Sequence, residues 1–220
     1  MGHRSISKTL KPEISKEELA GLETWLREAD LSGPHLEIGT AAGGTLCFLL
    51  QQYPAATRPR FSVVDTMSYF DDQLEIVKRN LREHELDPDQ IDFRITNSST
   101  AYVAADRAGD HFDFILVDAS HKIRHVNDDL RWLRLLNVGG IACFHDYAEK
   151  FPGVRWPIDR FLRRNPHFTI VDQAGSLVCV RKERVGTRPE ISLGDRVWAA
   201  VCSVFLQWQR SWRKRRGRTG

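Results

Sequence analysis

Cysteine is scarce in this sequence, which has only four among its 220 residues. The four stand singly in apolar surroundings, at Cys47, Cys143, Cys179 and Cys202. Structural zinc sites and dithiol redox motifs need closely spaced cysteine pairs, so the sequence predicts neither kind of site. We expect four reduced cysteines in the core.

Long apolar runs are also lacking. No stretch approaches the roughly 18 consecutive apolar residues of a membrane-spanning helix, and residues 1–15 lack the apolar stretch of a signal peptide. Hydrophobic residues make up 41% of the chain and charged residues 28%, which is ordinary for a soluble globular protein and argues against general disorder. The sequence therefore predicts a cytoplasmic protein.

A strong excess of charge is missing from most of the chain, although the formal net charge is +3. Six basic residues without an acid among them stand near the end, at Arg210, Arg213, Lys214, Arg215, Arg216 and Arg218. Removing these six from the 32 lysines and arginines leaves 26 against 29 acids, so the rest is mildly acidic. This balance argues against a general nucleic-acid-binding surface, and we expect no specific nucleic acid partner.

Helical and strand patterns alternate along the chain. Ser15 and Glu18 fit a helix-capping box, and apolar residues recur at helical spacing from there through Ala29. Strands separated by helical patterns predict parallel βαβ units. Five apolar runs of this kind follow, at 35–39, 60–65, 91–96, 112–118 and 139–146.

The helix before the fifth run is the clearest of the series, because four apolar side chains between residues 126 and 136 share one face. Gly139 and Gly140 follow it directly. Since glycine commonly follows the last turn of a helix, these two residues are predicted to end it.

The pattern changes beyond residue 150. A helix is predicted at 154–164, and strands at 167–172 and 176–182 lie so close in sequence that they form an antiparallel hairpin. This order excludes the eight βα units of a TIM barrel and favours an α/β fold, a doubly wound Rossmann-like seven-stranded sheet with a C-terminal antiparallel hairpin. We divide the chain into an N-terminal arm or lid at 1–14, a main domain at 15–182, a linker at 183–194 and a basic amphipathic C-terminal helix and tail at 195–220.

The turn after the first strand, HLEIGTAAGG at 35–44, points to an unusual ligand. It lacks the G-x-G-x-x-G spacing that cradles a dinucleotide pyrophosphate, yet Glu37 stands just before glycines that let a ligand approach the backbone. Asp65 ends the second strand, where an acid is placed to accept hydrogen bonds from ribose hydroxyls. Taken singly, the turn is also typical of any strand-to-helix loop, and Asp65 of a helix N-cap.

This E-x-G-x-x-x-G turn, the acid after the second strand and the seven-strand order resemble the class I S-adenosylmethionine (SAM)-dependent methyltransferases, over roughly residues 15–182. The resemblance implies that Gly39 and Gly43 line the methionine part of SAM and that Asp65 holds its ribose. It also implies that Asn97 and Ser98 border the adenine, while Glu37 orients the turn near the cofactor ammonium. The implied cofactor site is Glu37, Gly39, Gly43, Asp65, Asn97, Ser98 and Asp118.

A second distinctive stretch, VDASHKIRHVNDDLRWLRLLNVGGIACFHDY, spans residues 117–147. It resembles a group of bacterial small-molecule methyltransferases with Asp-x-x-His, Gly-Gly and His-Asp-Tyr elements, whose site plan is shared with the catechol-type O-methyltransferases. The resemblance implies that Asp118 and Asp146 bind Mg²⁺, which prefers oxygen ligands. It further implies a catalytic pair of Asp118 and His121, with the imidazole of His121 as the base.

One departure from the catechol-type pattern concerns the metal. Tyr147 follows the second acid, where the catechol-type enzymes carry an amide or acid ligand. Either His145 supplies a nitrogen ligand instead, or His121 acts as the base without any ion. Taken singly, Asp118 and Asp146 are also typical of helix caps, and His121 of a surface histidine.

The end of the chain is a basic amphipathic helix. Its apolar residues at helical spacing are Val197, Val201, Val204, Phe205, Trp208 and Trp212. The interpretation that we favour is packing of this stripe on the main domain or on a second subunit, as in a homodimer. The alternative is peripheral contact with the inner face of the membrane, with tryptophans at the headgroups and arginines on anionic lipid.

The leading hypothesis is a SAM-dependent methyltransferase, an enzyme that O-methylates a small-molecule hydroxyl such as that of a sugar, a phenol or a secondary metabolite. Two alternatives remain open. A metal-dependent hydrolase would leave the first glycine turn unexplained, and its cluster would be Asp118, His121, His145 and Asp146. A non-catalytic protein would bind the cofactor and act through the basic tail.

Overall fold

The structure is a computed structural model that describes residues 14–186 and 191–216, with side chains described up to residue 209. The predicted N-terminal arm therefore lies almost entirely outside the described residues, as do part of the predicted linker and the last four residues of the tail.

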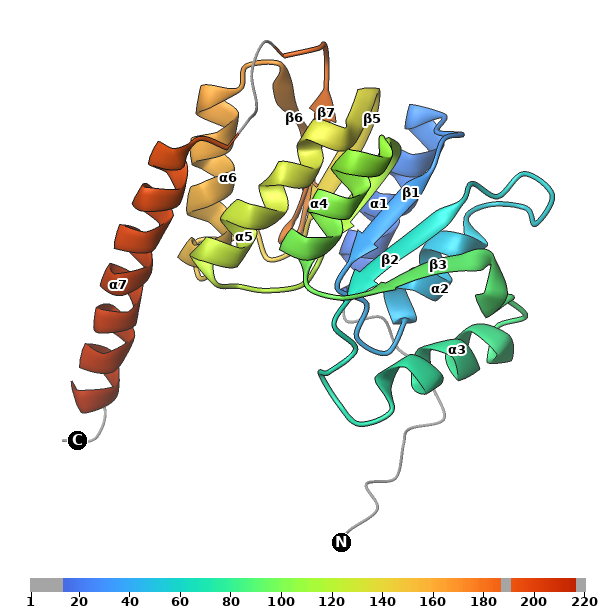
Figure 1. Cartoon of the computed structure of the whole chain (residues 1–220), viewed down its shortest axis with the longest axis horizontal. Helices are drawn as coiled ribbons and strands as arrows, with labels where there is room; N and C mark the ends of the chain where they lie inside the picture. The colour runs from blue at the N-terminus through green and yellow to red at the C-terminus, as the bar shows by residue number, and fades with distance from the viewer. Residues whose placement is uncertain (1–13, 187–190, 217–220) are drawn as a thin grey trace, which may run out of the picture.

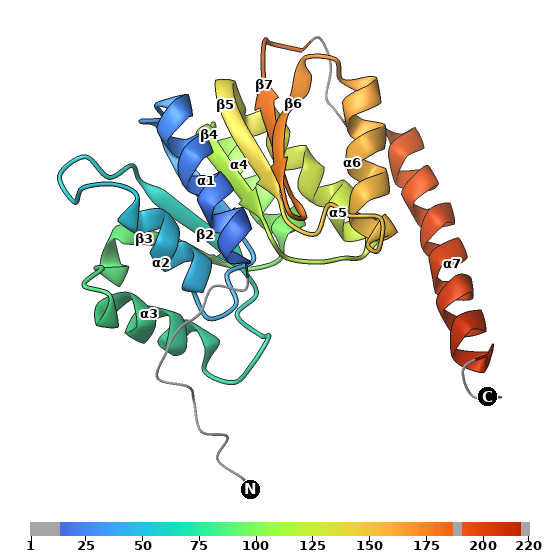
Figure 2. The ribbon, with the colours of Figure 1, turned by 180° about the vertical axis from the view of Figure 1, so that it is seen from behind.

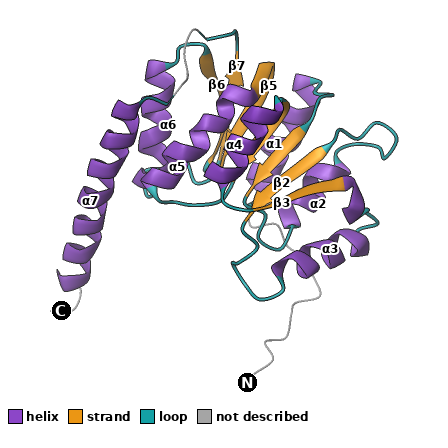
Figure 3. Ribbon diagram, in the orientation of Figure 1, coloured by secondary structure: helices purple, strands orange, loops and turns teal. Residues whose placement is uncertain are grey.

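Seven strands form one mixed sheet in the order β3-β2-β1-β4-β5-β7-β6 (Figures 1 and 3). The first five strands pair in parallel, whereas β7 runs antiparallel to both β5 and β6. The predicted doubly wound sheet with its terminal hairpin is confirmed. The strands are β1 (His35–Ile38), β2 (Phe61–Asp65), β3 (Ile91–Ile95), β4 (Phe112–Val117), β5 (Leu136–Phe144), β6 (Phe168–Ala174) and β7 (Leu177–Lys182).

Helices cover both faces of the sheet (Figures 1 and 2). Alternate residues of a strand point to opposite faces. Leu36 and Ile38 of β1 enter the apolar layer that includes side chains of α4, α5 and α6, whereas Phe114 and Leu116 of β4 enter the layer that includes side chains of α1, α2 and α3. The helices on the two faces are α1 (Lys16–Ala29), α2 (Gly44–Gln51), α3 (Gln73–Glu83), α4 (Ser98–Ala108), α5 (Ile123–Asp129) and α6 (Pro152–Arg164). Two short 3₁₀ helices are η1 (Pro88–Gln90) and η2 (Leu130–Leu135).

Helix α1 begins with the predicted capping box. The Ser15 hydroxyl accepts a hydrogen bond from the Glu18 amide at 3.3 Å, and the Glu18 carboxylate accepts one from the Ser15 amide at 2.8 Å. Two backbone donors that the first turn leaves unsatisfied therefore find side-chain partners.

The predicted helix over residues 126–136 is confirmed up to Leu135, although its second half is a 3₁₀ helix, whereas its predicted end at Gly139 and Gly140 is wrong. Helix α5 ends at Asp129, η2 follows, and β5 begins at Leu136, so Gly139 and Gly140 lie inside the strand and do not end a helix. The reason is a bulge, because Phe112 pairs with Leu136 but Phe114 pairs with Ile141. Gly139 takes a positive φ of 85° in this bulge, a backbone conformation that glycine adopts without strain.

The last helix, α7 (Leu193–Arg216), contacts α5 and α6 and extends beyond their ends (Figures 1 and 2). Among the described residues, no helix combines the length and the apolar character needed to cross a membrane. All four cysteines are free thiols; three are buried and Cys202 is half-buried.

Strand order reverses between β1 and β4, which is where doubly wound sheets bind ligands. At this point Gly39 has a φ of 85°, and a Cβ added to it would collide with the carbonyl oxygen of Asp118 after β4. Glycine therefore allows the ends of β1 and β4 to lie against each other.

We predict that Gly39→Ala destabilises the fold by roughly 2–4 kcal/mol, because a positive φ and a backbone collision are both imposed on the alanine. Gly109→Ala is the matched control, since Gly109 also has a positive φ but open space around it. Gly109→Ala should lower the free energy of unfolding by only about 1 kcal/mol. Urea unfolding measures both, and equal losses would contradict the close approach of β1 and β4.

Candidate active site

A cleft of about 1010 Å³ opens at the carboxyl edge of the parallel strands. Most of the polar residues singled out from the sequence line it, while Glu37, Gly39 and Gly43 do not. The structure thus brings together residues from four strand ends. The predicted site residues in the lining are Asp65, Asn97, Ser98, Asp118, His121, His145 and Asp146.

Strand β1 carries a buried carboxyl group near its end. Glu37 is almost fully buried, and its Oε2 atom has no hydrogen-bond partner. Burial raises the pKa of Glu37 to about 8, and the nearby charges of Asp118 and Asp65 act in the same direction. Gly43 caps α2 with a φ of 84° and faces the side chain of Val77. A buried carboxyl oxygen without a hydrogen-bond partner is costly unless a ligand group supplies one.

Asp65 holds the loops at the end of β2. Its carboxylate accepts hydrogen bonds from the backbone amides of Thr40 at 2.9 Å and of Met67 at 2.7 Å. The acid therefore fixes the glycine turn against its own strand end. The carboxylate also borders the cleft, where its remaining lone pairs are available to a ligand.

Asn97 and Ser98 start α4 at the next strand end. Asn97 is the N-cap, and its side chain accepts from the Thr100 amide at 2.9 Å. The Ser98 hydroxyl accepts from the indole nitrogen of Trp132 at 2.9 Å. Both residues have structural partners, yet both still border the cleft.

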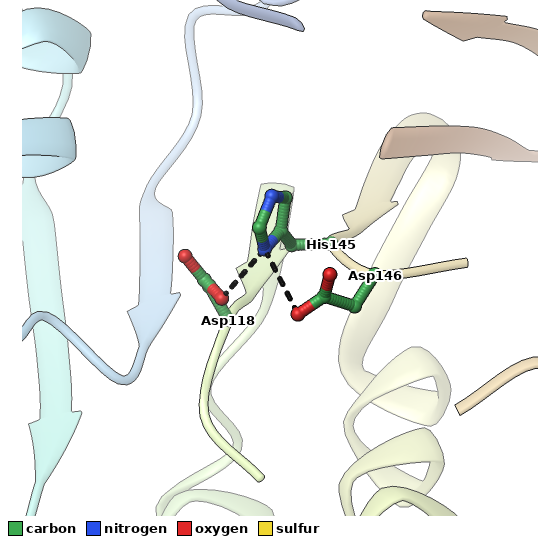
Figure 4. A group of neighbouring side chains, drawn as sticks. All are labelled: Asp118, His145 and Asp146. Atoms are coloured by element: carbon green, nitrogen blue, oxygen red, sulfur yellow. Dashed lines mark hydrogen bonds and ion pairs between the residues drawn. The ribbon is translucent and has the colours of Figure 1, made fainter. Parts of the chain in front are cut away.

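Asp118, His145 and Asp146 form a cluster at the ends of β4 and β5 (Figure 4). The Nδ1 atom of His145 lies 3.0 Å from Asp118 Oδ1 and 3.5 Å from Asp146 Oδ2. One ligand atom from each residue lies within 4.8 Å of the others, a spacing that suits a bound metal ion. Asp146 adopts a positive φ of 59°, uncommon for a residue other than glycine.

Charge around His145 is strongly negative. Its Nε2 atom lies 3.5 Å from the buried carboxylate of Glu18, so the imidazole contacts three acids. Burial alone would lower the pKa of His145, but the hydrogen bond with Asp118 and the charges of the three acids outweigh burial and raise it to about 9. At neutral pH this imidazole is a cation that balances the cluster.

His121 stands at the mouth of the cleft with half of its side chain exposed. Its Nε2 atom lies 2.5 Å from Asp146 Oδ2, and its ring stacks on Phe151 with centroids 5.1 Å apart. These two contacts fix the plane of the His121 ring. The other ring nitrogen, Nδ1, takes no part in the contact with Asp146. His125, one helical turn on, contacts Ser120 instead.

Tyr147, whose place in the sequence put the metal in doubt, does not join the cluster. Its hydroxyl donates a hydrogen bond to Asp159 Oδ1 at 2.5 Å, and its ring is buried. The position after Asp146 therefore supplies no ligand here, and His145 occupies the third place in the group.

Sequence reasoning missed two buried acids. Glu18 was assigned to the capping box, yet its carboxylate also accepts from the Ser176 amide and hydroxyl at 2.9 and 2.7 Å. Asp129 borders the cleft near Ser98, and burial raises its pKa to about 7. The only signal for Asp129 was an acid at the end of the amphipathic helix.

The residues present fit the two groups that the resemblance implies. The unpartnered Glu37 oxygen matches an ammonium group, and Asp65 at the cleft matches a ribose. Two carboxylates and an imidazole form a donor set for a divalent ion, in which the nitrogen widens the range beyond Mg²⁺ to metals such as Mn²⁺.

Comparison with known proteins identifies a family and a shared fold. A family model described as a methyltransferase domain matches residues 36–147. Solved structures at low identity share the fold, among them an O-methyltransferase from Bacillus cereus in complex with SAH, at 17% identity and a TM-score of 0.61, covering 77% of this chain and 83% of that one. No curated protein matches the sequence.

Two further structures come from biosynthetic enzymes. TomG from Streptomyces achromogenes, an O-methyltransferase involved in tomaymycin synthesis in complex with SAM, has 17% identity and a TM-score of 0.61, covering 78% of this chain and 82% of that one. The TDP-rhamnose 3′-O-methyltransferase of calicheamicin biosynthesis has 16% identity and a TM-score of 0.60, covering 74% and 78%.

We predict that Glu18→Gln lowers stability at neutral pH by roughly 1–3 kcal/mol. Burial would raise the pKa of Glu18, but hydrogen bonds from Ser176 and Ser15 outweigh it and lower the pKa to about 2. A lowered pKa stabilises the fold above the ordinary value of 4.5, and this stabilisation is lost as pH falls towards 2.

Urea unfolding should therefore show that the gap between wild type and Glu18→Gln narrows by about half from pH 5 to pH 3. Glu17→Gln, on the exposed side of the same turn, should show little gap at any pH. A gap for Glu18→Gln that stays constant over this range would contradict the assignment.

Proposed function

We propose that this chain, which belongs to the methyltransferase domain family, transfers a methyl group from SAM to a hydroxyl group of a small molecule. The observation that carries the proposal is the position of His121. It is held by Asp146 and Phe151 in the cleft that Asp65 also borders. A candidate base and a candidate cofactor site thus share one cavity.

For the cofactor, we assign the ammonium group to Glu37 and the ribose hydroxyls to Asp65. Bound SAM supplies a methyl group on a cationic sulfur. A cation beside Glu37 would favour the charged carboxylate and lower its raised pKa, giving the unpartnered Oε2 atom a partner. Gly39 and Gly43 shape the turn at the methionine end, and Asn97 and Ser98 border the adenine.

For the acceptor, we assign to His121 the role of the base that removes the hydroxyl proton. Because Nε2 faces the Asp146 carboxylate, Nδ1 is the nitrogen that takes the hydroxyl proton, and Asp146 stabilises the resulting imidazolium. Asp118 completes the catalytic pair indirectly, because it holds His145, which in turn contacts Asp146.

For the metal, we propose that Asp118, Asp146 and His145 hold a divalent ion such as Mg²⁺ or Mn²⁺. Such an ion lowers the pKa of a hydroxyl bound to it. His145 ligates only after losing its proton, because a protonated nitrogen has no lone pair for a metal. The protonated imidazole of His145 and the metal ion therefore compete for the same carboxylates.

We propose a polar acceptor, such as a sugar, a phenol or another secondary metabolite, since the cleft is lined largely by polar side chains. The similarity to a TDP-rhamnose methyltransferase and to TomG supports this class. We also propose that the enzyme works in the cytoplasm, at the inner face of the membrane, with α7 as the contact.

The two alternatives are not favoured. A hydrolase would leave Glu37 and the glycine turn without a role, and the match to a methyltransferase domain spans both the turn and the cluster. A non-catalytic binder would have no use for the ordered contacts of His121.

We predict micromolar SAM binding by calorimetry and a fall of roughly 10- to 100-fold in affinity for Asp65→Ala, the loss expected for a hydrogen bond to a charged group. Glu75→Ala, an exposed acid on α3, is the matched control and should bind as the wild type does. Absence of SAM binding to the wild-type protein would overturn the proposed function.

We predict that Mn²⁺ binding near pH 7.5 releases about one proton, because His145 with a pKa near 9 must deprotonate to ligate. Calorimetry in two buffers of different ionisation enthalpy measures the release. Asp118→Asn should weaken binding. Equal heats in the two buffers would show that His145 keeps its proton and is not a ligand.

A further inference from the structure

Up to residue 209, where its side chains are described, helix α7 has two apolar faces, and one of them packs on α5 and α6. Ala199 and Leu206 are buried against Ile123 of α5, and Trp198 and Cys202 pack beside them. The sequence-based expectation that the stripe beginning at Val197 packs on the main domain is therefore wrong, because a different face of the helix does so.

An ionic contact fixes the rotation of α7 about its axis. The buried carboxylate of Asp195 accepts hydrogen bonds from Arg160 of α6 at 2.8 Å and from the Ser192 hydroxyl at 2.7 Å. The Arg160 guanidinium also lies over the Trp198 ring. With its first turn held in this way, α7 turns one face towards α5 and α6 and leaves its second face outward.

The second face, which we call the outer stripe, consists of Val197, Val201, Val204 and Phe205. Their exposed fractions are 57%, 65%, 68% and 46%. On an ideal helix these residues fall within a sector about 100° wide and along a line of roughly 12 Å. Trp208, 60% exposed, extends this line. Contiguous exposed apolar side chains of this kind mark an interaction surface.

Charge identifies the partner of the outer stripe. No acid follows Asp195 in the sequence, whereas seven basic residues do, beginning with Arg196. Five of them, between residues 210 and 216, lie on the same helix just beyond the outer stripe. A second copy of this chain would bring an equally basic helix, so charge disfavours pairing of two such segments.

We propose that α7 is a docking surface for an anionic lipid bilayer. The outer stripe enters the boundary between headgroups and acyl chains, and the basic residues after it contact anionic headgroups. Tryptophan favours this boundary, which suits Trp208 and the sequence position of Trp212. The docking is independent of the proposed methyl transfer, since no residue of the outer stripe borders the cleft.

Flotation of the full chain with lipid vesicles tests the proposal. The wild-type protein should float with vesicles that contain phosphatidylglycerol and stay behind with vesicles of phosphatidylcholine alone. Added salt should weaken the binding, because it screens the basic residues. Replacement of three stripe residues, Val201→Gln, Val204→Gln and Phe205→Gln together, should lower the partition by roughly tenfold or more.

A matched control changes exposed apolar residues elsewhere, with Val138→Gln, Ile170→Gln and Val185→Gln in one variant. The control should float as the wild type does. Melting temperature and SAM binding check that the variants fold, and Val197→Gln with Val204→Gln serves as the stripe variant if the triple change unfolds.

Three outcomes would overturn the proposal. The wild type could fail to float with anionic vesicles. The stripe variant could float as well as the wild type, which would leave charge alone as the cause. Light scattering could show a dimer that the stripe variant dissociates, without vesicle binding, and a second copy of the chain would then be the occupant.

Discussion

The contact of one imidazole with three carboxylates holds the site together. His145 follows β5, Glu18 lies on α1, and Asp118 and Asp146 follow β4 and β5. Glu18 also binds the backbone of Ser176 in the turn between β6 and β7. A single, largely buried cation thus ties the first helix, two strand ends and the terminal hairpin to one point. Without the cation, three acids in a poorly solvated space would repel one another.

The same contact links stability to chemistry. The strained backbone at Asp146 is maintained because its carboxylate meets both His121 and His145. Asp118 lies where strand order reverses, and its carbonyl oxygen leaves room only for glycine at position 39. The fold therefore brings the end of β1 and the acid–histidine cluster to the same edge of the sheet, and loosening either would disturb the other.

Local patterns allowed much of this arrangement to be predicted from the sequence. The capping box at Ser15, the strand ends and the acids at 65, 118 and 146 follow from short-range rules. Features that depend on long-range contacts could not be predicted in this way. The bulge at Gly139 depends on pairing with β4, and the contact of Glu18 with His145 joins residues far apart in the chain. The sequence pattern did not indicate the face of α7 that packs on α5 and α6, because small or mixed side chains such as Ala199 and Cys202 form it.

The most direct measurement is transfer of a labelled methyl group from SAM to a panel of hydroxyl compounds, including nucleotide sugars and phenols, by wild type, His121→Ala and His125→Ala. The account predicts transfer to oxygen by the wild type and a loss of roughly 10²- to 10⁴-fold for His121→Ala at unchanged SAM affinity. His125→Ala should remain active. Full activity of His121→Ala, or methylation only at nitrogen or carbon, would contradict the account.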